Sequence, residues 1–426
     1  MSLHRRRFLS TTVFTAVGSY AVAYSSAWGA MGPNDRLQLG FIGVGVMGRG
    51  HLSRFLEQPD VQVLAISDVV AERRDSAQQM VVSRYSQKKD KGQASVCQQY
   101  GDFRELLARK DIDAVVIATP DHWHAIPCIL AARAGKDIYC EKPLTRTIAE
   151  GRQIVEEVNK AKCIFQTGSQ QRSEFGHRFR KAVLLVQQGV IGKVKTVRIG
   201  VGAPAVPCDL PGQPVPPGTD WKMWVGPAAM RDYNEVLCPK GVHRHFPLWR
   251  NYREYAGGGL ADMGAHHFDI AQWALGMDDS GPVTIEPPSG NQNSGLRYLY
   301  ANGIEMFHGG PSGCTFEGSE GTIYVDRDQF KITPDQLAKR EVQDDRQKVY
   351  FSTNHHRNWL ECIKQRKQPI CTAETGHRSA SICHLGNIGY QLRTRLTWDP
   401  KAERFVGNEE ANKLLSPNYR AEWQKV

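Results

Sequence analysis

Several features that would place this 426-residue chain in a common class are absent. Ten cysteines are present, yet no Cys-x-x-Cys pair occurs, so their spacing gives no sign of a disulfide framework. Four cysteines lie in or beside apolar runs: Cys97, Cys128, Cys140 and Cys163. Such thiols are expected to be buried and reduced, packing as small core residues. Cys208 and Cys238, in a loop-rich stretch, are the one pair considered for a bridge.

The sequence also lacks clustered basic residues, internal repeats and, beyond its first 30 residues, any long apolar run. Its formal net charge is +10, but the Lys and Arg residues are scattered and no basic run is interleaved with aromatic residues. A solvated basic surface therefore explains the charge better than nucleic-acid binding. Because 426 residues exceed one ordinary core, two domains are expected.

The first 30 residues differ from the rest of the chain. Arg5-Arg6-x-Phe8-Leu9 precedes a mostly apolar stretch at 13–27, and small residues follow at 25–30. This pattern predicts a twin-arginine export signal over 1–30, which carries a folded protein to the periplasm or another extracytoplasmic compartment. The alternative is an uncleaved tail or a membrane anchor. Because the run is short and contains many polar residues, no stable membrane span is expected after export.

A short apolar strand at 37–42 runs directly into a glycine-rich turn and then into a helix-like segment. Glycines at the spacing Gly43-x-Gly45-x-x-Gly48 allow a tight turn, close approach of the backbone to a pyrophosphate, and close packing of helix on strand. The free N–H groups at the helix start favour phosphates, aided by the helix dipole. The stretch predicts a dinucleotide site with contacts from Gly43, Gly45, Val46, Met47 and Gly48.

A second strand, at 61–66, ends close to Asp68. The Asp68 carboxylate can accept hydrogen bonds from both hydroxyl groups of an adenine ribose and would repel a 2′-phosphate, so NAD is favoured over NADP. Arg73 and Arg74 keep NADP open, because arginines bind 2′-phosphates. An exported protein could hardly collect NAD outside the cytoplasm, so it is expected to fold around its cofactor before export.

Apolar runs then alternate with helical segments. The run at 114–118 is continuous and rich in β-branched residues, which is typical of a strand buried on both faces. With a further strand at 137–140, the pattern predicts a doubly wound parallel sheet, the dinucleotide-binding domain, over 35–170. Ligands bind such sheets beyond the carboxyl ends of the strands, where residues 119–124 and 141–143 would lie.

A change in composition predicts a second, α+β domain over 171–426. Six prolines at 203–218 exclude regular structure there, and 220–255 is dense in aromatic residues and histidines. Short β-type runs alternate with glycines over 283–325, as in a mainly antiparallel sheet. The other expected elements are a helix at 174–188, a strand at 194–200, and closing helices at 354–364 and 378–392 that could pack back on the first domain.

Four motifs are specific when taken together: Gly43-x-Gly45-x-x-Gly48, Ala118-Thr119-Pro120 with His122 and His124, Glu141-Lys142-Pro143, and Asp262-x-x-x-His266. With them the chain resembles the glucose–fructose oxidoreductase, inositol dehydrogenase and rhizopine-catabolism (Gfo/Idh/MocA) family over essentially everything after the leader. The resemblance implies a Rossmann domain followed by an open-faced, mainly antiparallel sheet. In that family the sheet supports the substrate and often forms the oligomer interface, so a homo-oligomer, a dimer or tetramer, is expected.

The motif residues suit alcohol oxidation, in which a hydride leaves for the nicotinamide and a proton leaves the hydroxyl group. Lys142, after a strand end, can stabilise developing alkoxide charge. If 260–275 forms one helix, Asp262 and His266 share a face, and histidine has the right pKa to take the proton near neutrality. The resemblance places Lys142, Asp262 and His266 in these catalytic roles. From the residues alone, a surface position for Lys142 would be the better interpretation.

The remaining predicted contacts are of two kinds. Cofactor contacts beyond the glycine turn are Asp68, Thr119, Pro120, His122, His124, Glu141 and Lys142. Substrate contacts are Arg172, Arg244, His245, Trp249 and His266, although Arg172 could equally be a domain-interface cation. His243 and His245 lack a third ligand at metal-binding spacing, so no metal is expected. The aromatic rings of 220–255 suit the C–H faces of a sugar, although such rings are more often core.

Three functions follow from these features. The first is an exported NAD-dependent oxidoreductase acting on a hydroxyl group of a sugar, cyclitol or glycoside. The second is a glycosidase or lyase that works through a transient keto-sugar; the family's glycosidase branch has a different histidine–glycine motif where this chain has residues 262–266, which weakens that interpretation. The third is a non-catalytic sugar-binding protein, against which the intact Lys142, Asp262 and His266 set argues.

Overall fold

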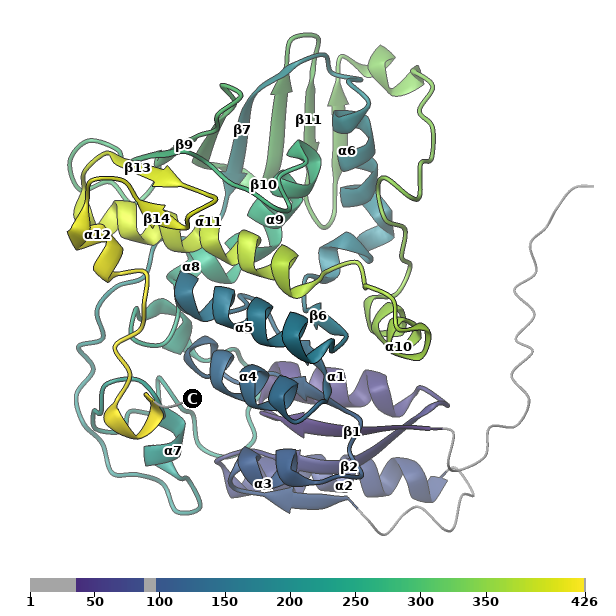
Figure 1. Ribbon diagram of the computed structural model, residues 1–426, viewed down its shortest axis with the longest axis vertical. Coiled ribbons are helices and arrows are strands. Elements are labelled where there is room, and N and C mark those ends of the chain that lie inside the picture. The colour runs from purple at the N-terminus through teal and green to yellow at the C-terminus, as the bar shows by residue number, and fades with distance from the viewer. Residues whose placement is uncertain (1–35, 88–96, 425–426) are drawn as a thin grey trace, which may run out of the picture. The chain divides into compact units, whose positions relative to one another are not determined.

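The computed structural model describes residues 36–87 and 97–424, so the predicted export signal at 1–30 lies outside the described part. Six parallel strands form the first sheet, in the order β3-β2-β1-β4-β5-β6 (Figure 1). The strands are β1 (Leu37–Ile42), β2 (Val61–Ser67), β3 (Gln98–Tyr100), β4 (Ala114–Ile117), β5 (Asp137–Cys140) and β6 (Phe165–Thr167). The helices between them are α1 (Val46–Leu56), α2 (Ala71–Gln87), α3 (Phe103–Ala108), α4 (Ala125–Arg133) and α5 (Ile148–Ala161). The predicted doubly wound parallel sheet is confirmed.

Helices cover both faces of this sheet, which explains why its central strand is apolar throughout. All four residues of β4 are buried. Val115 and Ile117 pack with α3, α4 and α5, whereas Ala114 and Val116 pack with α1 and α2 on the other face. Side chains of α10 (His355–Gln365) join the second of these cores, Trp359 among them. Residues from the end of the chain therefore complete the core of the first sheet.

The second sheet has eight strands and is antiparallel, as predicted. Its order is β12-β11-β10-β9-β8-β13-β14, with β7 paired to β10. The strands are β7 (Val194–Gly200), β8 (Thr284–Glu286), β9 (Arg297–Leu299), β10 (Glu305–Gly318), β11 (Thr322–Val325), β12 (Phe330–Thr333), β13 (Leu396–Asp399) and β14 (Arg404–Phe405). Three helices pack on it, α6 (Arg178–Gln187), α9 (Gly264–Leu275) and α11 (Ala373–Leu392). The short helices α8 (Gly258–Asp262) and α12 (Glu409–Lys413) complete this half.

Residues 201–257 form a long insert between β7 and α8, and its one α-helix is the short α7 (Trp221–Val225). The proline-rich part, 203–218, has only isolated bridges, as predicted. Most of the aromatic residues of the insert pack on one another: Trp221 stacks on Trp224 with ring centroids 4.7 Å apart, and Tyr233 meets Trp221 edge-on. These rings are the core of the insert rather than an exposed platform.

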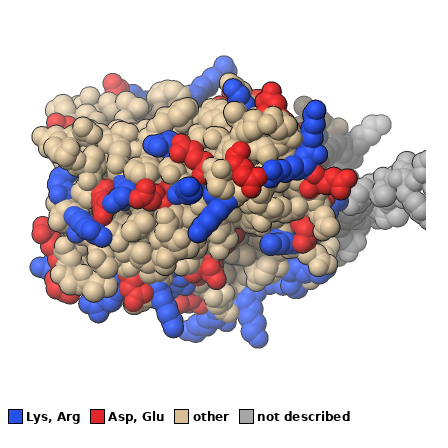
Figure 2. All heavy atoms as spheres, turned by 90° about the horizontal axis from the view of Figure 1, so that it is seen from above, with Lys and Arg blue, Asp and Glu red and all other residues tan. Residues whose placement is uncertain are grey.

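All ten cysteines lie in the described part of the chain, and each is a free thiol. Nine are buried and Cys208 is half-buried, so the prediction of reduced core thiols is confirmed and Cys208 and Cys238 form no bridge. Within the described residues no helix is both long and apolar enough to cross a membrane. On the face shown in Figure 2, basic and acidic side chains are interspersed rather than gathered in a patch of one sign.

Candidate active site

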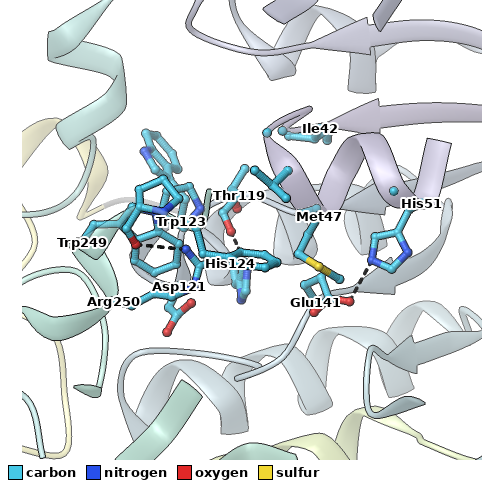
Figure 3. Close-up of a pocket in the computed structure, with 18 of the residues that line it drawn as sticks. Ile42, Met47, His51, Thr119, Asp121, Trp123, His124, Glu141, Trp249 and Arg250 are labelled. Carbon is cyan, nitrogen blue, oxygen red and sulfur yellow. Dashed lines mark hydrogen bonds and ion pairs between the residues drawn. The ribbon is translucent and has the colours of Figure 1, made fainter. Parts of the chain in front are cut away.

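A pocket of about 490 Å³ opens beyond the carboxyl ends of the parallel strands. Residues of the first sheet form one part of its wall, and residues of the insert, α8, α9 and the β11–β12 turn form the rest. Figure 3 shows its floor, with Thr119, His124 and Met47 from the first sheet's edge facing Trp249 and Arg250 from the insert. The predicted sites of cofactor and substrate therefore share one cavity.

The glycine turn is shaped to admit a phosphate group. Gly43 has φ +84°, and a Cβ there would lie 2.8 Å from the Ala118 carbonyl; a Cβ on Gly48 would lie 2.0 Å from the Gly43 oxygen. A Cβ on Gly45 would meet nothing within 4 Å, because Gly45 faces the open pocket. No side chain caps the N-terminus of α1, so its first N–H groups face this space. These residues fit the pyrophosphate of a dinucleotide.

Asp68 lies at the end of β2 and lines the pocket. Its Oδ2 accepts from the Val44 N–H at 2.9 Å and its Oδ1 from the Val70 N–H at 3.0 Å, which fixes the carboxylate while leaving lone pairs for hydroxyl groups. The two neighbouring arginines are engaged elsewhere. Arg73 donates to the carbonyls of Gly241 and Pro239, and Arg74 donates to the Asp68 carbonyl. This arrangement suits the diol of an NAD ribose rather than a 2′-phosphate.

Lys142 and Asp262 form the central ion pair of the pocket. The Lys142 Nζ lies 2.7 Å from Asp262 Oδ1 and 2.8 Å from the Asp262 carbonyl oxygen. Burial opposes ionisation of Asp262, but Lys142 and Arg250 outweigh it and lower the pKa of that carboxyl below its usual value. The lysine side chain is 12 % exposed, so it is not the surface lysine that the residues alone would suggest.

The helix predicted over 260–275 is interrupted between Asp262 and His266. Helix α8 ends at Asp262 and α9 begins at Gly264. In an unbroken helix the His266 N–H would donate to the Asp262 carbonyl; here that carbonyl accepts from Lys142, and the His266 N–H donates to Met263 instead. The prediction of one helix was wrong for this reason. Both side chains nevertheless line the pocket.

His266 is buried, and its Nδ1 has no hydrogen-bond partner in the described chain. Burial, together with the nearby charges of Lys142 and Arg327, lowers the pKa of His266 well below its usual value. The imidazole is therefore neutral at neutral pH, and its pKa is not the near-neutral one expected from the sequence, because burial and the two cations oppose protonation. A neutral imidazole has a lone pair that can accept a proton from a bound hydroxyl group.

Glu141 accepts hydrogen bonds from side chains that no local sequence motif identified. Its Oε1 accepts from His51 Nε2 and from Gln170 Nε2, each at 2.8 Å, and His51 Nδ1 lies 2.8 Å from His356 Nε2. Burial raises the pKa of Glu141, but His51 and Lys142 outweigh it and leave the pKa lowered. Figure 3 shows the His51–Glu141 contact at the edge of the pocket. The carboxylate is thereby fixed and ionised beside Lys142.

Three of the predicted cofactor residues, His122, His124 and Gly48, make contacts within the protein that hold the site in shape. His124 lines the pocket, with Nδ1 2.8 Å from the Pro143 carbonyl and Nε2 2.9 Å from the Thr119 carbonyl. His122 does not line it and lies 3.0 Å from the Trp224 carbonyl. Gly48 packs against Gly43 behind the turn. The other predicted cofactor residues line the pocket: Gly43, Gly45, Val46, Met47, Asp68, Thr119, Pro120, Glu141 and Lys142.

The predicted substrate residues divide in the same way. Trp249 and His266 line the pocket, whereas Arg172, Arg244 and His245 do not. Arg172 is buried between Asp269 and Asp278, with its Nη2 2.7 Å from each carboxylate, so its position is that of an internal cation. Arg244 and His245 are exposed on the insert. Within the described residues, no group of His, Cys, Asp and Glu side chains is arranged to hold a metal ion.

Sequence reasoning missed several charged residues of the wall, among them Asp121, Arg250 and Arg327. Asp121, within the Thr119–His124 motif, is 5 % exposed, and burial raises the pKa of its carboxyl well above the usual value. Arg250 lies 4.2 Å from the Trp249 ring centroid and 3.6 Å from Asp262. Arg327, in the β11–β12 turn, donates to Gln171. Asp121 had a local signal, its place beside a recognised motif; the two arginines had none.

Comparison with known proteins agrees with this geometry. One family profile, described as "Oxidoreductase family, NAD-binding Rossmann fold", matches residues 37–169, and a second, described as "Oxidoreductase family, C-terminal alpha/beta domain", matches 205–425. The chain is similar to the myo-inositol 2-dehydrogenase of Thermotoga maritima, with 25% identity over 367 residues, 80% of this chain and 92% of that protein.

Two further similarities are more limited. A glycosyl hydrolase family 109 protein of Shewanella pealeana is 32% identical over 215 residues, which is 46% of this chain and 45% of that protein. The structure of a levoglucosan dehydrogenase in complex with NADH and levoglucosan has a TM-score of 0.55 at 17% identity, covering 85% of this chain and 99% of that one. At this identity the structural similarity supports the fold.

Proposed function

Because the chain belongs to the Gfo/Idh/MocA family of NAD-dependent oxidoreductases, we propose that it is an exported enzyme that transfers a hydride between a tightly held NAD and a secondary hydroxyl group of a sugar, cyclitol or glycoside. The observation that carries the proposal is the meeting of Lys142, Asp262 and His266 in the same pocket as the glycine turn. NAD, when bound, supplies the hydride acceptor. The chain's own residues then have to manage a proton and a developing negative charge.

The geometry gives each of the three residues a distinct task. Lys142 points its ammonium group into the pocket and can stabilise a substrate oxygen as it loses its proton. Asp262 holds that ammonium group through two contacts, one from its side chain and one from its backbone. His266 is kept neutral by burial and can accept the hydroxyl proton. His266 is buried, whereas Lys142 and Asp262 are partly exposed, so the ion pair stays open to a ligand that enters the pocket.

The substrate class rests on the relatives and on the insert. The similar proteins include an inositol dehydrogenase and a levoglucosan dehydrogenase, which act on polyhydroxylated rings. Trp249 adds an aromatic face to the pocket wall opposite the first sheet's edge. Aromatic faces pack well on the C–H faces of such rings. The division into a signal at 1–30, an NAD-binding domain at 35–170 and a substrate domain at 171–426, and assembly as a dimer or tetramer, belong to the same proposal.

Export together with a held cofactor gives a direct test. Protein purified from the periplasm without added nucleotide should show nicotinamide absorbance or fluorescence, and a panel of sugars, cyclitols and glycosides should oxidise or reduce it in place. A protein isolated without nucleotide and with weak affinity for NADH would contradict the held cofactor. Retention of activity in the cytoplasm after Arg5→Lys and Arg6→Lys replacement, with loss from the periplasm, would support the twin-arginine route.

A second candidate is a glycosidase or lyase that oxidises a ring carbon transiently, eliminates the glycosidic group and then returns the hydride. The observation that favours it is the 32% identity to the glycosyl hydrolase family 109 protein over 215 residues. Residues 262–266 differ from the motif of that branch. Release of nitrophenol from nitrophenyl glycosides, without net formation of NADH, would distinguish this activity from net oxidation.

A further inference from the structure

Arg327 lines the pocket and is fixed in place by a neutral side chain, with no carboxylate within ion-pair distance among the described residues. Its Nε donates to Gln171 Oε1 at 2.9 Å, and its guanidinium lies 4.9 Å from the Phe175 ring centroid. Its backbone carbonyl accepts from Arg178, which anchors the turn. The two terminal amino groups make no hydrogen bond and no ion pair within the described chain. The guanidinium is therefore held in one orientation, and its two terminal amino groups are available to a ligand.

The hydrogen bond from Arg327 to Gln171 places the guanidinium beside His266. The same Gln171 amide donates to the His266 carbonyl at 3.2 Å, so one side chain connects Arg327 to the residue that accepts the proton. The positive charge of Arg327 also contributes to lowering the pKa of His266 and of Asp262. Arg327 thus faces the place where a substrate would lie.

Arg172 differs from Arg327 in having two carboxylate partners. Arg172, the residue after Gln171, is buried. Asp269 and Asp278 neutralise its charge and raise its pKa despite burial. At Arg327 no carboxylate is within ion-pair distance, and desolvation lowers its pKa. Half-burial without a paired carboxylate disfavours the charged form of Arg327, and an anion placed against it would offset this cost.

Two further cations line the pocket near Arg327. Lys142 and Arg250 lie there together with the carboxyl groups of Asp121, Glu141, Glu174 and Asp262. Asp262 is ionised and already paired with Lys142 and Arg250. Burial raises the pKa of Asp121 well above its usual value, although Arg250 and Lys142 act in the opposite direction. Lys142 and Arg250 are thus engaged by Asp262, whereas the terminal amino groups of Arg327 are not.

We infer that the substrate carries an anionic group, a carboxylate or a phosphate, which is bound by the two terminal amino groups of Arg327. This inference rests on the proposed function, because it names the class of sugar or cyclitol that the pocket takes. A planar guanidinium with its Nε already used still offers two parallel donors to one carboxylate or phosphate edge. Charge-assisted hydrogen bonds of this kind favour an anionic sugar over its neutral parent by roughly 10- to 100-fold.

The test measures binding within matched pairs, so it does not depend on turnover. The NADH-loaded protein is titrated calorimetrically with D-glucose, D-glucuronate and D-glucose 6-phosphate, with D-galactose and D-galacturonate, and with myo-inositol and its monophosphate. In at least one series the anionic member should bind 10-fold or more tightly than its neutral parent. Preference for the uronate identifies a carboxylate and preference for the phosphate identifies a phosphate. Equal affinity within every series, including no measurable binding, would overturn the inference.

Two variants assign the preference to this residue. Arg327→Gln should remove the preference for the anion while leaving the affinity for the neutral sugar and for NADH unchanged, and Arg327→Lys should restore part of it. Arg404→Gln, which removes one positive charge from an exposed ion pair with Glu409, is the control for net charge and should change nothing. An equal loss for neutral and anionic members in Arg327→Gln, with NADH binding intact, would contradict the inference.

Failure of the proposed function would look different. A protein that binds no NADH, and that reduces no NAD⁺ with any sugar, would refute the oxidoreductase assignment. The same titration of the protein as isolated would still show whether an anion is preferred at Arg327.

Discussion

The two halves of the pocket are built from different parts of the polypeptide. The dinucleotide half is made by the turn at 43–48, by Asp68 and by the strand end at 119–120. Much of its surface is backbone, because the turn is rich in glycine. The substrate half is made by charged side chains that come from separate elements. Lys142, Asp262 and Arg327 are among them. The first half recognises its ligand by shape, and the second by charge.

This difference predicts how each half fails. Adding an atom to the glycine turn obstructs the dinucleotide and leaves the charges of the other half unchanged. Removing a charge from the substrate half leaves the dinucleotide site intact and changes the chemistry. The four predictions below test this separation, beginning with the largest expected effect.

Replacement of Lys142 by Met should lower kcat by about 10²- to 10³-fold, because the group that stabilises the developing alkoxide is lost. NADH affinity, measured by fluorescence titration, should change little. Lys401→Met, at an exposed lysine far from the pocket wall, is the matched control. Unchanged activity in Lys142→Met would favour a non-catalytic sugar-binding protein, and a joint loss of NADH binding would break the separation of the two halves.

Replacement of Gly48 by Ala should weaken NADH binding by roughly 10- to 100-fold, because overpacking of this kind costs about 1–3 kcal/mol. The new Cβ would lie 2.0 Å from the Gly43 oxygen and would push the turn out of shape. Gly281→Ala, whose Cβ would meet its nearest neighbour at 3.6 Å, is the control. The unfolding temperature of both variants is measured with the affinity; normal NADH binding by a folded Gly48→Ala protein would contradict the role of the turn.

His266 should make the fold less stable in acid. Its pKa is depressed in the folded protein, so below its ordinary pKa of about 6.5 the unfolded chain binds more protons. The free energy of unfolding is therefore highest above that pH. As the pH falls below it, this one group lowers the free energy of unfolding by about 1.4 kcal/mol per pH unit. Urea unfolding at pH 7, 6 and 5 should show a shallower loss in His266→Gln. The exposed His245→Gln is the control, and an equal slope in both variants would refute the prediction.

Replacement of Asp121 by Asn should have the smallest effect, within about 3-fold in kcat/KM, because burial raises its pKa and a neutral amide then replaces a neutral acid. Asp121→Leu, which offers no hydrogen bond, should reduce kcat/KM further. A pH profile of kcat/KM is measured for each. A large loss in Asp121→Asn, together with a shift of the acidic limb, would show that the carboxyl acts in its ionised form.

Much of the fold could be predicted because its signals are local. The strand at 194–200 and the strand at 137–140 have the bounds that their apolar patterns indicated. The helix predicted at 378–392 begins earlier, at Ala373, because the Thr372 hydroxyl accepts from the Thr375 N–H and caps the helix there. The break at Met263 had no such signal, since it depends on Lys142, which is 120 residues distant.

The candidate site could be predicted only where its residues belong to short motifs. The glycine turn, Lys142 and the Asp262–His266 pair line one pocket. Arg172 was expected to bind substrate, yet it is enclosed by Asp269 and Asp278, which the sequence could not reveal as its neighbours. Arg327 lies in a turn with no motif at all. Its importance depends on the absence of a counter-charge, which only a complete set of contacts can show.

The sequence by itself determined the parallel sheet, the phosphate-binding turn and the preference for a diol at Asp68, because backbone conformation and short-range spacing set those features. The tertiary structure decided which charged side chains share the pocket and which are neutralised inside the protein. A charge acts through its distance from other charges, and that distance is fixed only when segments far apart in the chain pack together.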